Sequence, residues 1–121
     1  MARTVRRGEV WLYTFRKPDK QRPVVIMTRD EVIPLLQTVT VAPVTSTIYG
    51  APGEVIIGPD EGLKHESAMN LDHLQTVSKK GLHTFLGTIK PEKMPAVCRA
   101  LGIALGCLAN APISGGPDDD S

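Results

Sequence analysis

The sequence predicts a mainly β domain of the α+β class: a small, strongly bent β-barrel followed by a C-terminal amphipathic helix. Ten prolines and eleven glycines divide the 121-residue chain into short segments rich in β-forming residues. After Pro91 the apolar residues change to a helical period. A hydrophobic content of 41% and a charged content of 22% are typical of one globular domain and exclude a disordered, collagen-like or coiled-coil chain.

Five or six short strands are expected in the first 90 residues. Residues 9–15 are dense in β-forming residues, with one set on alternate positions (Val10, Leu12, Thr14) and the aromatic residues between them. Residues 23–28 form a continuous apolar run, which indicates a strand buried on both faces. Residues 29–36 are expected to form one helical turn or a loop, because Pro34 shortens any helix there. The remaining strands are expected at residues 38–45, 54–57, 67–77 and 84–89. Pro43 indicates an edge position, a bulge or the end of its strand.

The C-terminal segment has one apolar helical face. Pro91 suits a first helical position and Glu92 the first turn, where the helix dipole favours negative charge. The apolar residues at helical spacing are Met94, Val97, Leu101, Ala104, Leu105 and Leu108. A close packing partner would explain Gly102 and Gly106 within it. We expect the domain to span residues 1–110 and residues 111–121 to form a disordered acidic tail.

Charge and cysteine content narrow the function classes. Net charge is +1, but residues 1–22 hold seven basic residues against two acidic ones, which favours a local anionic partner such as a phosphate backbone, or a solvated arm. Cys98 and Cys107, placed on opposite faces of the expected helix, cannot form a disulfide with each other. Histidine and cysteine spacings support no zinc site. No apolar stretch is long enough for a membrane span or follows the N-terminal arginines as in a secretory signal, so a cytoplasmic protein is predicted.

Several sequence blocks resemble the MazF/PemK family of toxin endoribonucleases. They are RRGEVW (6–11), QRPVVIM (21–27), VAPVTS (41–46) and SAMNLDHLQTV (67–77), followed by KKGL (79–82). The blocks follow the order and spacing of the family and cover about residues 5–110. The resemblance implies an SH3-like barrel with a C-terminal helix, a homodimer, and a cognate antitoxin whose extended segment blocks the RNA groove.

The resemblance also implies cleavage of single-stranded RNA without a metal or other cofactor. The family uses an arginine and a threonine or serine, which correspond here to Arg22 and Thr45. Attack of the 2′-OH on its own phosphate leaves a 2′,3′-cyclic phosphate and a 5′-OH. The planar guanidinium of arginine pairs with phosphate oxygens and stays charged, which suits phosphorane stabilisation and proton donation but makes it a poor proton acceptor.

Further candidates for RNA binding surround these two residues. They are Lys17, Lys20, Gln21, Ser46, Thr47, Asp72 and His73. His73 stands where the family usually has a glutamine, and the connection before Arg22 is short and basic where many members have a longer glycine-containing loop. These differences leave the cut sequence and the choice between mRNA, tRNA and rRNA open.

Three alternatives stay open. His73 and His83 could form a two-histidine acid–base site, because histidine exchanges protons near neutral pH. The same fold also serves a toxin that poisons DNA gyrase without cutting RNA, although such toxins lack the pair that Arg22 and Thr45 represent. The third alternative is a catalytically inactive SH3-like module that only binds nucleic acid or protein.

Overall fold

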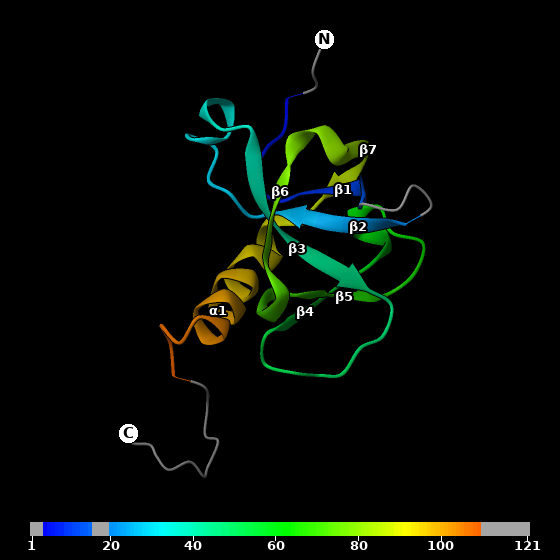
Figure 1. Ribbon diagram of the computed structural model, residues 1–121. Coiled ribbons are helices and arrows are strands. Elements are labelled where there is room, and N and C mark those ends of the chain that lie inside the picture. Colours follow the sequence, from blue (N-terminus) through cyan, green and yellow to red (C-terminus); the bar gives the residue numbers. More distant parts are fainter. Residues whose placement is uncertain (1–3, 16–19, 110–121) are drawn as a thin grey trace.

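The computed structural model describes residues 4–15 and 20–109, in which seven strands form one antiparallel sheet and are followed by one α-helix (Figure 1). The expected tail at 111–121 and Lys17 lie outside the described residues. The elements are β1 (Glu9–Thr14), β2 (Gln21–Ile26), β3 (Thr38–Thr45), β4 (Glu54–Ile57), β5 (Ser67–Asn70), β6 (Gln75–Ser78), β7 (Leu82–Thr88) and α1 (Met94–Ala104). Among these residues no helix is long and apolar enough to cross a membrane.

The strands follow the order β4-β5-β3-β2-β1-β7, and β6 also pairs with β3. One side of β3 is therefore shared by two partners: its first half pairs with β6 up to Val41↔Gln75, and its end pairs with β5 from Val44↔Met69. Pro43 lies in this central strand between the residues that pair with β6 and those that pair with β5. Neither β5 nor β6 pairs with position 43, so the missing N–H of the proline costs the sheet no hydrogen bond to these strands. The edge strands β4 and β7 do not pair with each other, so hydrogen bonds do not close the sheet, and the order and the C-terminal helix agree with the predicted SH3-like fold.

Two apolar clusters occupy the two faces of this sheet. The larger cluster includes Val25, Met69 and Leu71 and is covered by Val97 and Ala100 of α1. The second cluster contains Trp11, Val24 and Ile26, among others. Neighbouring residues of β2 thus enter opposite clusters, which confirms the prediction of a strand buried on both faces.

The single strand predicted at 67–77 is wrong, because the chain turns between two short strands there. A 3₁₀ turn at Leu71–His73 separates β5 from β6. The Asp72 N–H donates to Asn70 Oδ1 over 2.9 Å, which starts the turn. Leu71 is 1% exposed and enters the larger core cluster. The turn lets one continuous segment pair with the two halves of β3 in succession.

The helix predicted to continue to Leu108 ends at Ala104. Gly106 has φ +77°, a left-handed conformation that terminates helices, and the Cys107 N–H bonds back to the Gly102 carbonyl over 2.7 Å. Leu108 folds against Gly102, where a Cβ atom would come within 2.7 Å of the leucine side chain. The close packing partner predicted for Gly102 is therefore the chain just beyond the helix, and Cys107 does not share the helix with Cys98.

The loop between β4 and β5, residues 58–66, is held by one buried carboxylate. Glu61 is fully buried; its Oε1 accepts from the Gly58 N–H over 2.8 Å and its Oε2 lies 2.9 Å from the Lys93 Nζ. Burial alone raises the pKa of Glu61, but the Gly58 N–H and the Lys93 ammonium outweigh it, so the pKa lies below the ordinary 4.5. The loop is thereby joined to the segment that leads into α1.

The same loop touches β7 through two glycines. A Cβ atom on Gly62 would lie 2.0 Å from the Leu86 carbonyl oxygen, and one on Gly87 would lie 2.4 Å from the Glu61 carbonyl oxygen. Gly62 also has φ +92°, which disfavours other residues. The two backbones can approach this closely only because neither position has a side chain. The contact packs the β4–β5 loop against the other end of the open sheet.

Replacing Glu61 by Gln is expected to lower the free energy of unfolding by about 2 kcal/mol at pH 7, because Lys93 loses its charged partner. A carboxyl whose pKa is lowered by folding stabilises the protein above its unfolded pKa, and this stabilisation is lost as pH falls through the folded value. The difference between wild type and Glu61→Gln should therefore narrow below pH 4.5. Denaturant titrations at several pH values measure it. The exposed Glu66→Gln is the control, and an unchanged difference at low pH would contradict the assignment.

Gly62→Ala and Gly50→Ala form a matched pair, because both glycines have positive φ but only Gly62 lacks room for a Cβ. Gly50→Ala is expected to cost about 1 kcal/mol from backbone strain alone. Gly62→Ala should cost at least about 2 kcal/mol more, because the loop must move away from β7. Thermal unfolding of both variants tests this. Equal midpoints would show that the close contact with β7 is unnecessary.

Candidate active site

Arg22 and Thr45 come together where β2 and β3 separate. The two strands pair from Ile26↔Val41 to Val24↔Pro43, and extending this register by two residues sets Arg22 opposite Thr45. On its other side Arg22 pairs with Tyr13 of β1, so the β1–β2 hairpin holds its backbone. The two residues that the sequence predicted to be catalytic are thus neighbours across the sheet.

Pro23 explains why the pairing stops there. In an antiparallel pair every second residue turns its N–H toward the same neighbour. The Met27 N–H donates to the Thr40 carbonyl over 2.8 Å, so residues 25 and 23 should donate to β3 in the same way. Position 23 is a proline and has no N–H to donate. The hydrogen bonds between β2 and β3 therefore end there, and the facing ends of the two strands, which carry Arg22 and Thr45, are not paired with each other.

Two pockets meet at this pair. The first has a volume of about 480 Å³ and lies toward the β4–β5 loop; the second has about 330 Å³ and lies toward the turn between β5 and β6. Arg22 and Thr45 line both pockets. Together the pockets make a groove that crosses the open strand ends, with the arginine and the hydroxyl at its centre.

The structure brings some of the other predicted residues to this groove and not others. Ser46 lines the first pocket and His73 the second. Four predicted RNA-binding residues are exposed but line neither pocket: Lys20, Gln21, Thr47 and Asp72. His83 is exposed on β7 and also lines neither pocket, so the groove does not bring it together with His73.

Sequence reasoning missed Lys64 and His65, which line the first pocket, and Asn70 and Gln75, which line the second. Lys64 and His65 form an adjacent pair of basic side chains between Gly62 and the buried Ser67. This basic pair is the local sequence feature that could have indicated an anion-binding site, but it does not predict where the β4–β5 loop lies in the fold. Their place depends on the pairing of Ile57 with Ser67 and on the contact of the loop with β7.

Hydrogen bonding leaves the central side chains available to a ligand. The Thr45 Oγ1 accepts from the Thr47 N–H over 3.1 Å, and its own proton stays free to donate. Arg22 and Lys64 contribute positive charge, and no carboxylate lines either pocket among the described residues. The groove therefore suits an anion that accepts hydrogen bonds, such as a phosphodiester.

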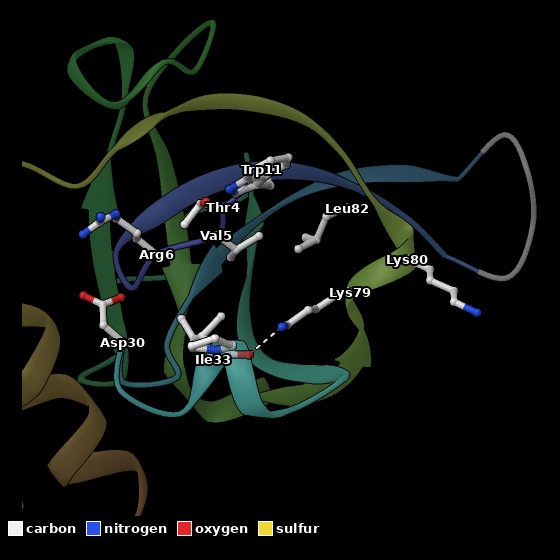
Figure 2. A pocket seen from close by; sticks show the side chains of 10 residues that line it. Thr4, Val5, Arg6, Trp11, Asp30, Ile33, Lys79, Lys80 and Leu82 are labelled. Atoms are coloured by element: carbon white, nitrogen blue, oxygen red, sulfur yellow. Dashed lines mark hydrogen bonds between the residues drawn. The ribbon is translucent and has the colours of Figure 1, made fainter. Parts of the chain in front are cut away.

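A larger pocket, of about 600 Å³, lies on another part of the surface, between Trp11, Ile33 and Leu82 (Figure 2). Lys79 points into it and donates to the Ile33 carbonyl, whereas Lys80 points away. The Lys79 ammonium thus stabilises the fold by joining the segment after β6 to the turn at Ile33. The pocket contains neither Arg22 nor Thr45 and is separate from the groove.

Within residues 4–15 and 20–109 no group of three or more histidine, cysteine, aspartate or glutamate side chains could hold a metal ion. Cys98 and Cys107 are free thiols and exposed. The chemistry that this groove can perform with its own side chains is phosphate binding by Arg22, hydrogen-bond donation by Thr45 and proton exchange by histidine.

Comparison with known proteins agrees with this geometry. A probable endoribonuclease of Mycobacterium tuberculosis, MazF5, is 40% identical over 102 residues, which are 84% of this chain and 93% of the relative. Endoribonuclease MazF3 of the same organism is 40% identical over 86 residues, 71% of this chain and 84% of the relative. Among solved structures, M. tuberculosis toxin MazF-mt6 superposes with a TM-score of 0.75 at 35% identity, covering 81% of this chain and 96% of that one.

A mycobacterial endoribonuclease solved in complex with its cognate antitoxin superposes with a TM-score of 0.77 at 25% identity, over 88% of this chain and 99% of that one. The family model of PemK-like, MazF-like toxins of type II toxin–antitoxin systems matches residues 6–105. That range includes every strand, the groove and α1. The chain belongs to the PemK-like, MazF-like family of type II toxins.

Proposed function

We propose that this chain is a toxin endoribonuclease that cuts single-stranded RNA without a metal and thereby inhibits translation and growth. The observation that carries the proposal is the presence of Arg22 and Thr45 in both pockets of the groove of a MazF-family chain. The endoribonuclease names of relatives at 40% identity support it.

In the proposed reaction the 2′-OH attacks the adjacent phosphorus, and the bond to the 5′ oxygen breaks. The guanidinium of Arg22 pairs with two phosphate oxygens and stabilises the negative charge that accumulates on the phosphorane. The free hydroxyl proton of Thr45 donates to the same oxygens. Arg22 also protonates the leaving 5′ oxygen, so that the products are a 2′,3′-cyclic phosphate and a 5′-OH.

The proposal extends to the partners of the protein, its domain bounds and its cellular location. We propose a homodimer, neutralised by a cognate antitoxin whose extended segment covers the groove; the mycobacterial endoribonuclease solved with its antitoxin supports this partner. Residues 1–110 form the proposed toxin domain, supported by the family match at 6–105. The proposed location is the cytoplasm. RNA contacts by Lys17, Lys20, Gln21, Ser46, Thr47, Asp72 and His73 belong to the same proposal.

Purified, antitoxin-free protein is expected to cut mixed single-stranded RNA in excess EDTA into fragments with 5′-OH ends. Arg22→Ala should slow cleavage by roughly 10²- to 10³-fold, because the phosphorane loses its bidentate donor, and Arg22→Lys should restore only part of the rate. End mapping of the fragments measures both effects. Arg29→Ala, at an exposed arginine beyond the other end of β2, is the control. Intact RNA with the wild-type protein would contradict the proposal and favour a gyrase poison or a binding module.

Thr45→Val is expected to lower kcat by roughly 10²-fold, since it removes the hydroxyl but keeps the branched shape at the strand end. Thr45→Ser should stay within a few-fold of wild type, because it keeps the donor. Initial rates on an RNA with one cleavable linkage compare the two variants. A Thr45→Val protein as fast as wild type would remove the hydroxyl from the mechanism.

A further inference from the structure

The proposed cleavage reaction requires a proton acceptor beside the 2′-OH. The 2′-OH must lose its proton as it attacks, and arginine and lysine are poor acceptors near neutral pH. No carboxylate lines either pocket among the described residues. Each pocket instead contains one histidine: His65 in the first and His73 in the second, on either side of Arg22 and Thr45.

Local hydrogen bonds give these two histidines opposite roles. The Nδ1 of His65 lies 3.3 Å from the Glu66 carbonyl oxygen, which can only accept, so Nδ1 carries the proton and the free lone pair is on Nε2. The Nδ1 of His73 lies 2.8 Å from the Nδ2 of Asn70. Because the Asn70 Oδ1 already accepts from the Asp72 N–H, the amide nitrogen donates to His73, whose own proton is then on Nε2. His65 presents an acceptor and His73 a donor.

The backbone that carries His65 is tied to the strand that carries Thr45. The Ser67 Oγ donates to the His65 carbonyl over 3.1 Å, and Ser67 is 5% exposed. The next residue, Ala68, pairs with Thr45. The backbone of His65 is therefore linked to Thr45 by a short path: the hydrogen bond to Ser67, the next residue Ala68, and the pairing of Ala68 with Thr45. This path keeps the imidazole at the groove, although the His65 side chain is exposed.

We propose that His65 is the general base of the cleavage reaction, an inference that rests on the proposed ribonuclease function. Its Nε2 takes the proton of the 2′-OH as the 2′ oxygen bonds to phosphorus. The bond from phosphorus to the 5′ oxygen breaks, and that oxygen takes a proton from Arg22. After product release the His65 imidazolium loses its proton to water and Arg22 regains one, so both residues return to their starting states. His73, with only a donor to offer, binds RNA and does not serve as the base.

Chemical rescue tests this assignment in EDTA on an RNA whose single cleavable linkage is chosen from the wild-type cleavage map. His65→Ala is expected to lower kcat by roughly 10²-fold with little change in KM. Added imidazole should restore the rate in proportion to its neutral form, because it replaces the missing acceptor. His73→Ala should raise KM and show no rescue. His83→Ala, at an exposed histidine outside both pockets, should cleave like wild type.

The possible outcomes separate this inference from the function on which it rests. A His65→Ala protein with the wild-type kcat overturns the inference while the ribonuclease function stands. Loss of activity without rescue by imidazole, in a variant that keeps the wild-type thermal midpoint, assigns His65 to binding and also overturns it. If wild-type protein leaves the RNA intact, the proposed function itself fails, and the inference falls with it.

Discussion

The burial of the Glu61 carboxylate is the interaction on which the groove depends. A buried carboxylate is tolerated only when hydrogen bonds and opposite charge compensate for its lost hydration, and here Gly58 and Lys93 do so. Gly58 directly follows β4 and Lys93 directly precedes α1. By binding both, the carboxylate holds the β4–β5 loop against the start of the helix. Gly62 and Gly87 then let that loop approach β7 closely. The wall of the first pocket, with Lys64 and His65, follows from this packing.

Pro23 and Pro43 shape the strand ends at the centre of the groove. Pro23 ends the hydrogen bonding between β2 and β3, and Pro43 sits where β3 changes its partner from β6 to β5. Elsewhere the hydrogen bond missing at Pro23 would weaken the sheet, but here its absence opens the sheet where Arg22 and Thr45 lie. The chain thus places a charged side chain and a hydroxyl at the end of a rigid sheet, and their backbones are held by Tyr13 and Ala68 on neighbouring strands.

Local pattern predicted most elements because their signals are local. The continuous apolar run of β2 and the helical period after Pro91 appear in short windows of sequence. The two errors occur where the apolar spacing continues through residues that turn the chain or end the helix. Residues 67–77 resemble one strand, but the burial of Leu71 and the bond from Asp72 to Asn70 turn the chain. The apolar spacing continues to Leu108, but the left-handed Gly106 ends the helix and lets Leu108 fold back onto Gly102.

The sequence by itself determined the class of fold, the family resemblance and the central pair, Arg22 and Thr45, because these lie within contiguous blocks whose residue types carry the information. Only the tertiary structure decided that His65 lines the groove beside the predicted His73 and that His83 does not. His65 and His73 lie on different turns, and their distance from Arg22 depends on strand register and on the contact between the β4–β5 loop and β7. His83, the sequence's second histidine candidate, lies outside both pockets. Pairings between distant segments are set by the packing of the whole core, and no local pattern specifies them.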